Sequence, residues 1–250
     1  MAPIATSDAT ANAPSTEFAA LAPLEAISCG PTLPGIPSFY ILEEKRQWMY
    51  GVHFGMLKAS DMILVNYHNG KIVGGNRSRP VNAAGVLIHA AIHKARPDVH
   101  AICHAHSIHG VSYSTFAKPL EMLNQDVCNI FGVQGVYSQY GGIVFGEGEG
   151  LKLAHALGPK GKGLILMNHG LLTVGKTCDE AGYLFRLMEK SCKIQLEVDA
   201  AAVNGLKKHI ISDEEAAYNF KMASESEILY CEFQPELEYE EFLSGPGFRT

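Results

Sequence analysis

The chain has 250 residues, 47% of them hydrophobic and 18% charged, and its formal net charge at pH 7 is −6. This composition allows a large buried core, and the acidic balance without any basic run argues against nucleic acid as a partner. No apolar run could span a membrane, no secretory signal opens the chain, and the six cysteines form no regular framework, which together predict a cytoplasmic protein with reduced thiols.

The chain is expected to hold one folded domain with a looser segment at each end. Residues 1–35 are rich in Ala, Pro, Ser and Thr and are predicted to form a flexible arm. The domain is expected over residues 36–235, followed by an acidic and aromatic tail over residues 236–250. Near the start of the domain, Asn69-Gly70 separates two apolar runs and predicts a hairpin over residues 62–73.

Helix and strand signals alternate through the rest of the domain. Each expected helix has an end signal, either a capping residue such as Asn82 at its start or a Gly-Pro or Asn-Gly pair at its end. Helices are predicted over 83–95, 147–157 and 177–203, with another from Ser212, and strands over 101–107, 133–140 and in two runs within 163–175. Strands bounded by helices throughout indicate a three-layer α/β domain.

Three histidines in this pattern indicate a metal site. His104 and His106 lie two residues apart on an expected strand, so their side chains point to one face. His169 follows the apolar run 163–167 and is also expected on a buried strand. Three imidazoles with an open fourth position are typical of catalytic sites for first-row divalent metals. The alternative is that all three are ordinary core histidines.

Two further groups of polar residues are candidates for the site. His89 and His93 lie one turn apart on the same predicted helix; a structural role is expected for His93, while for His89 both roles stay open. Asn124, Gln125 and Asp126 form a polar island inside an apolar stretch. Buried polar groups need hydrogen-bond partners, so this island marks either a turn or the site.

The order and spacing of these motifs resemble the class II aldolase/adducin family. The matching segments are Asn82-x-x-Gly85-x-x-Ile88-His89-x-x-Ile92-His93-x-Ala95-Arg96-Pro97-Asp98, then His104-Ala-His106, then Asn168-His169-Gly170. The resemblance covers roughly residues 53–235. It implies an α/β/α sandwich around a central mixed sheet, commonly assembled as a tetramer with active sites near subunit interfaces.

The resemblance also implies a chemistry. Enzymes of the family bind zinc or another divalent ion through the histidines that match His104, His106 and His169, and they cleave a carbon–carbon bond with the metal as a Lewis acid. Related members are decarboxylases or epimerases, and one branch resembles iron-dependent oxygenases of secondary metabolism. Adducin-like members serve the cytoskeleton without chemistry. Zinc is therefore the expected metal, with iron as the alternative.

The chain departs from the family pattern in two places. The sugar-phosphate aldolases carry a catalytic Glu four residues before the helix histidine, and Gly85 stands at that position here. The Gly-(Asn/His)-x-Ser segment that helps to bind phosphate or carboxylate is missing from its usual place, since Gly75-Asn76-Arg77-Ser78 follows the hairpin. A sugar phosphate is therefore not the expected substrate.

Proton transfer must then come from a residue other than the family's Glu. Asp126 is the first candidate, because desolvation in an apolar stretch would make its carboxylate a stronger base. Gln125 as an orienting donor, His89, and water activated by the metal are the others. The alternative role of Asp126 is to cap a local turn.

The expected function is that of a metal-dependent carbon–carbon lyase, by aldol cleavage or decarboxylation. The expected substrate is a small oxygenated or aromatic carbon acid. A non-heme iron oxygenase and a non-catalytic adducin-like interaction protein are the alternatives.

Overall fold

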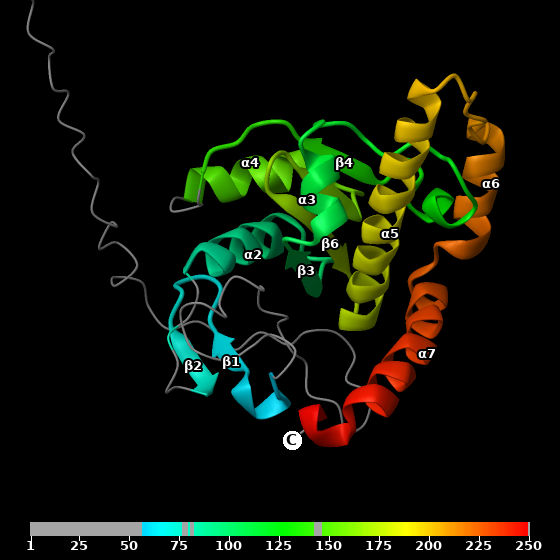
Figure 1. Ribbon diagram of the computed structural model, residues 1–250. Coiled ribbons are helices and arrows are strands. Elements are labelled where there is room, and N and C mark those ends of the chain that lie inside the picture. The colour runs from blue at the N-terminus through cyan, green and yellow to red at the C-terminus, as the bar shows by residue number, and fades with distance from the viewer. Residues whose placement is uncertain (1–56, 77–79, 81–82, 143–146, 250) are drawn as a thin grey trace, which may run out of the picture.

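A computed structural model describes residues 57–76, 80, 83–142 and 147–249. The expected N-terminal arm and the expected capping residue Asn82 lie outside the described residues. Figure 1 shows a central sheet with helices on both faces and a pair of C-terminal helices, α6 (Asp213–Ala223) and α7 (Ser226–Ser244), beside it.

The central sheet is mixed and has the strand order β3-β6-β5-β4. Its strands are β3 (Ala101–Ala105), β4 (Gln134–Tyr137), β5 (Gly163–Leu166) and β6 (Gly170–Gly175). β6 is antiparallel to both β3 and β5, whereas β4 runs parallel to β5. The expected α/β fold with a central mixed sheet is confirmed.

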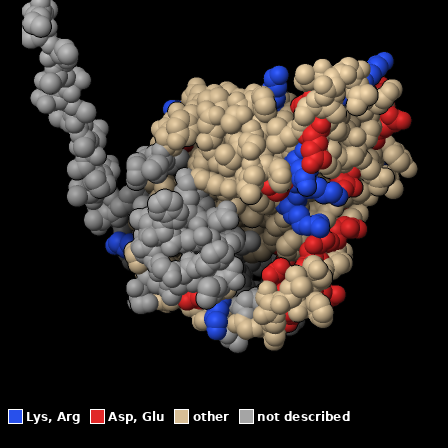
Figure 2. All heavy atoms as spheres, in the orientation of Figure 1, with Lys and Arg blue, Asp and Glu red and all other residues tan. Residues whose placement is uncertain are grey.

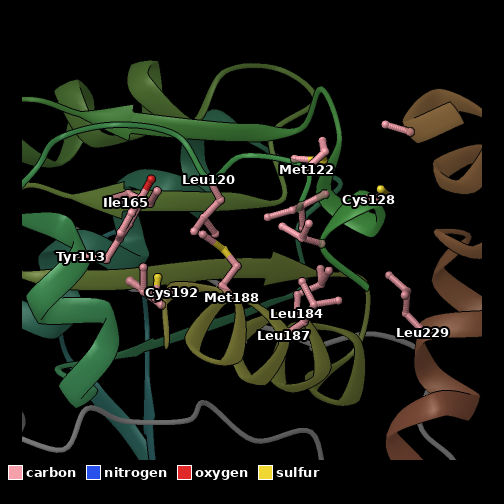
Figure 3. Packing of buried hydrophobic residues seen from close by; sticks show 14 residues of the cluster. Tyr113, Leu120, Met122, Cys128, Ile165, Leu184, Leu187, Met188, Cys192 and Leu229 are labelled. Carbon is pink, nitrogen blue, oxygen red and sulfur yellow. The ribbon is translucent and has the colours of Figure 1, made fainter. Parts of the chain in front are cut away.

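The alternation of side chains along β5 and β6 builds two cores, one on each face of the sheet. Leu164, Leu166, Leu172 and Val174 pack in one cluster with buried residues of α2 (Ala83–Ala95) and α4 (Glu147–Leu157). Residues of the opposite parity, such as Ile165, pack in the other cluster under α3 (Ile108–Ser114) and α5 (Cys178–Val203). Figure 3 shows this second cluster, which completes the three layers.

The predicted hairpin is present as β1 (Ile63–Val65) and β2 (Ile72–Gly75), which pair in antiparallel fashion. Its turn is held by the Asn69 side chain, which accepts a hydrogen bond from the Lys71 N–H, and Gly70 adopts a positive φ of 69°. The hairpin lies against α2, and residues of both line a small apolar pocket.

The helix ends follow their sequence signals with one exception. α4 ends before Gly158, which has a φ of 71°. At the start of α5, Thr177 accepts the Glu180 N–H as expected, but the Glu180 carboxylate does not complete a capping box. It is fully buried and instead accepts hydrogen bonds from Lys162 Nζ at 2.5 Å and the Lys176 N–H at 2.7 Å.

Two helices follow α5. α6 (Asp213–Ala223) begins at the capping residue Ser212, as predicted, and α7 spans Ser226–Ser244. The boundary expected after residue 235 falls inside α7, which continues into the acidic and aromatic tail as far as Ser244. Within the described residues, no helix combines the length and the apolar character needed to cross a membrane.

The face shown in Figure 2 carries basic side chains over α5 and acidic side chains along the neighbouring α7. Arg186 on α5 pairs with Glu236 on α7 at 2.7 Å, and Lys190 pairs with Asp126 at 2.8 Å. All four side chains are at least one-third exposed, so these two ion pairs add little to the stability of the fold.

Candidate metal centre

Three histidine side chains converge at the end of β3. The ring nitrogens of His104, His106 and His169 that face one another all lie within 4.8 Å. The ring centroids are 4.6 to 5.3 Å apart, and each pair of rings is steeply inclined. His104 is buried, with 2% of its surface exposed, and the other two are half-buried. The three residues predicted from the sequence therefore share one site.

His104 and His106 reach this site because β3 ends between them. His104 is the fourth residue of β3 and pairs with Leu172 of β6, so it lies on the sheet face covered by α2 and α4. β3 ends at Ala105, and His106 follows it directly. The side chains of residues two apart on an extended chain point to one face, as the sequence indicated.

His169 reaches the same point from a turn and not from a strand, which corrects the sequence prediction. Residues 167–169 connect β5 to β6, and Asn168 adopts a left-handed conformation with a φ of 56°. Gly170 has a φ of 145°, and a Cβ atom there would lie 2.7 Å from the carbonyl oxygen of Ala105. The absence of a side chain at Gly170 therefore lets the turn lie against the end of β3.

A hydrogen bond orients the most buried ligand candidate. His104 Nδ1 lies 2.7 Å from the carbonyl oxygen of Leu171. A carbonyl oxygen only accepts, so Nδ1 is the donor of this hydrogen bond and Nε2 is the nitrogen that would ligate a metal. This arrangement, with one ring nitrogen bound to a backbone carbonyl, is typical of histidines that ligate metals.

The donor set fits a divalent first-row metal. Three neutral imidazoles are common ligands of zinc and iron. Ligands about 2.0–2.1 Å from a tetrahedral ion would be about 3.4 Å apart, and the three ring nitrogens here lie within 4.8 Å of one another. Among the described residues, this is the one group of His, Cys, Asp or Glu side chains close enough to hold an ion.

Asp126 and Gln125 lie outside the three-histidine group. They stand at the start of the short 3-10 helix η5 (Asp126–Ile130), and both are exposed. The premise that Asp126 is buried is wrong, because its side chain is 51% exposed and paired with Lys190. The Asn124 side chain accepts the Val127 N–H, so the polar island forms a turn. A catalytic role for either residue stays a prediction.

His89 and His93 both line the pocket between α2 and β1. His93 has the structural role expected of it, because its Nδ1 donates to the Val99 carbonyl at 3.0 Å. Burial lowers the pKa of His93, which keeps the ring neutral. Gly85 lines the same pocket, so α2 presents no carboxylate at that position. His89 lies in this pocket and outside the three-histidine group.

Sequence reasoning missed Glu189 on α5. Its carboxylate accepts hydrogen bonds from the backbone N–H groups of His109 and Gly110, at 3.0 and 2.7 Å, at the start of α3. These residues lie about 80 positions apart in the chain, so no local pattern could connect them. The Glu189 side chain is itself half-buried, with 24% of its surface exposed.

The Arg96-Pro97-Asp98 segment has a structural role. Arg96 binds both oxygens of Asp98, at 2.8 and 2.7 Å, and donates to the carbonyls of Gly158 and Gly161. It therefore joins the end of α2 to the loop between α4 and β5.

Comparison with known proteins gives consistent relatives. The family model described as "Class II Aldolase and Adducin N-terminal domain" matches residues 48–196. The Meiotically up-regulated gene 14 protein of Schizosaccharomyces pombe is 38% identical over 201 residues, which is 80% of this chain and 77% of that protein. The 4-hydroxy-3-prenylphenylpyruvate oxygenase/4-hydroxy-3-prenylbenzoate synthase of Streptomyces roseochromogenus is 40% identical over 148 residues, which is 59% of this chain and 52% of that protein.

A solved structure agrees with these relatives. The L-fuculose 1-phosphate aldolase from Glaciozyma antarctica PI12 superimposes with a TM-score of 0.71 at 39% identity, covering 80% of this chain and 75% of that chain. The family model spans more than half of the 250 residues, and the fold matches as well. The chain belongs to the class II aldolase/adducin family.

Proposed function

We propose that this protein is a metal-dependent carbon–carbon lyase, acting by aldol cleavage or decarboxylation. Its substrate would be a small oxygenated or aromatic carbon acid. The single observation that carries the proposal is the convergence of His104, His106 and His169 within 4.8 Å. A scaffold protein gains nothing from three imidazoles facing one another, because burying polar side chains together is costly without a ligand.

The three histidines would hold one divalent ion, zinc first and iron as the alternative. When bound, the ion would supply Lewis-acid chemistry by polarising a carbonyl or carboxylate oxygen of the substrate. The protein's own contribution is orientation. The Leu171 carbonyl fixes the ring of His104, and the close contact at Gly170 fixes the turn that bears His169.

The proton donor or acceptor is the open part of the proposal. Gly85 leaves the family's acid/base position without a carboxylate. We keep Asp126 as the first candidate, with Gln125 and His89 behind it. Asp126 is exposed, bound to Lys190 and outside the three-histidine group of its own chain, so we propose that it serves the site of a neighbouring subunit. The proposal includes a homo-oligomer, for which the family resemblance favours a tetramer, and a cytoplasmic location.

The choice of substrate class rests on the missing phosphate-binding segment. One similar structure is called an L-fuculose 1-phosphate aldolase, but the Gly-(Asn/His)-x-Ser segment is not in its usual place in this chain. The similar Streptomyces protein is named for an aromatic prenylphenylpyruvate and benzoate. An aromatic or oxygenated acid without phosphate therefore fits both observations.

The name of the Streptomyces protein also favours one second candidate, a non-heme iron oxygenase. Gly85 favours a third, a non-catalytic adducin-like interaction protein, because the usual catalytic carboxylate is absent. These alternatives differ in metal and in oxygen use, which makes them separable by experiment.

The test uses protein purified without added metal. We expect zinc in the protein, and release of an aldehyde or CO2 from hydroxy and oxo acids that stops with a chelator and needs no O2. A His169→Ala variant should lose this turnover, and His155→Ala, at an exposed position on α4, should retain it. If the protein contains iron and consumes O2, the non-heme iron oxygenase is the correct function and the lyase is wrong. If neither assay shows turnover and the protein binds no metal, the non-catalytic adducin-like interaction protein is the remaining candidate.

A further inference from the structure

Helix α3 begins at Ile108, two residues after the candidate ligand His106, and its own sequence does not cap it. Ser107 occupies the N-cap position with φ −65° and ψ 149°, but its side chain makes no capping hydrogen bond. The first N–H groups of a helix have no partner inside the helix and need one from elsewhere. A serine at this position usually provides it.

Glu189 on α5 supplies the cap from another layer of the fold. Its Oε1 accepts the His109 N–H at 3.0 Å and its Oε2 accepts the Gly110 N–H at 2.7 Å. His109 Nδ1 also donates to Oε1, at 2.8 Å. Burial acts to raise the pKa of Glu189, but the hydrogen bonds from His109 and Gly110 help to hold it below its usual value. The group is therefore a carboxylate at neutral pH.

The start of α3 also lies directly against the strand that orients His104. A Cβ atom on Gly110 would lie 2.6 Å from Ser107 Oγ and 2.7 Å from Leu171 Cγ. Leu171 is the residue whose carbonyl oxygen accepts the hydrogen bond from His104 Nδ1. The Glu189 carboxylate therefore holds a segment that follows His106 and packs against Leu171.

We propose that Glu189 is a positioning residue for the metal centre. It holds the start of α3 in place, and through it the backbone of His106 and the contact with Leu171. This inference rests on the proposed function, because it assigns the geometry of the same metal site. Glu189 binds the backbone N–H groups of His109 and Gly110 and the His109 ring, so we assign its effect on the metal site to the backbone.

Glu189→Gln tests the inference, because the amide keeps the size of the side chain but offers one acceptor oxygen to two N–H groups. The probe is Co2+, whose visible spectrum reports ligand geometry. The matched control is Glu197→Gln on the same helix, where the carboxylate is 67% exposed and 3.9 Å from Lys193. We expect Glu189→Gln to keep helical circular dichroism, to change the Co2+ spectrum and to weaken binding about tenfold. The control should match the wild type.

Two results would overturn the inference in different ways. If the wild type binds Co2+ and Glu189→Gln has the same affinity and spectrum, Glu189 does not position the site and the proposed function stands. If the wild type takes up no Co2+, both proposals fall together. Should Glu189→Gln not fold, Glu189→Asp retains the charge but is too short to reach both N–H groups. The same comparison then applies, and a wild-type spectrum in that variant refutes the inference.

Discussion

Replacing Gly170 by alanine should damage the metal centre more than the fold. The new Cβ would lie 2.7 Å from the Ala105 carbonyl oxygen, which is 0.7 Å less than the 3.4 Å at which ordinary contact begins. Because the Ala105 carbonyl directly precedes His106 and Gly170 directly follows His169, relief of the clash separates these ligands. The φ of 145° adds backbone strain of about 1–3 kcal/mol for a residue with a side chain.

The assays are urea unfolding and competitive zinc binding, with Gly132→Ala as the control. Gly132 also has a positive φ, 71°, but a Cβ there meets no atom within 4 Å. Gly132→Ala should lose about 1 kcal/mol of unfolding free energy and bind zinc normally. Gly170→Ala should lose at least as much and bind zinc at least about tenfold more weakly, which is about 1.4 kcal/mol. Equal zinc affinity in the two variants would refute this account of the turn.

Two further predictions concern stability. In α4, Gly148→Ala should stabilise the protein by about 0.4–1 kcal/mol, because a Cβ atom there meets no neighbour. Gly150→Ala should destabilise it by about 1–3 kcal/mol, because its Cβ would lie 2.6 Å from that of Ala91. Thermal melts that rank the two variants in the opposite order would contradict the packing of α2 on α4. The hydrogen bond from Arg96 holds the pKa of Asp98 below its usual value of 3.8. A carboxyl whose pKa is lower in the folded state stabilises the fold at pH values above its pKa in the unfolded state. This stabilisation is lost as the pH falls through its pKa in the folded state. Asp98→Asn should therefore lose about 0.2–1 kcal/mol of unfolding free energy at pH 7, a small amount because the side chain is exposed. In urea titrations the difference between wild type and variant should shrink below pH 4. A difference that stays constant with pH would exclude the Arg96–Asp98 pair as its source.

Much of the fold could be predicted because the local signals are strong. The helix expected over residues 147–157 has those bounds, since Gly158 can adopt the positive φ that ends it. The hairpin at Asn69-Gly70 and the helix that begins at Ser212 follow the same logic. The helical nature of α7 was not predicted, because Pro235 and dense acidic residues obscure its apolar face.

The candidate ligands could be found because they obey a simple geometric rule. Residues two apart share a face of an extended chain, which placed His104 beside His106. The strand expected around His169 was wrong because an Asn-His-Gly sequence can turn tightly: Asn168 tolerates a left-handed conformation and Gly170 tolerates close backbone contact.

The rest of the site depends on contacts between distant segments, which a local pattern cannot contain. Asp126 was expected to be buried because its neighbours are apolar, but those neighbours turn inward through η5 while its own side chain points outward to Lys190. Glu180 looked like half of a capping box, but its carboxylate instead accepts a hydrogen bond from Lys162, a half-buried residue just before β5. Glu189 binds a helix about 80 residues earlier in the chain.

The metal content of the purified protein tests the central claim most directly. Elemental analysis of the wild type should give one divalent ion per chain, and the His104→Ala, His106→Ala double variant should give none. The His155→Ala variant should match the wild type, because His155 is exposed on α4 and outside the three-histidine group. Full metal content in the double variant, or none in the wild type after zinc is supplied, would contradict the assignment of His104, His106 and His169 as a metal site.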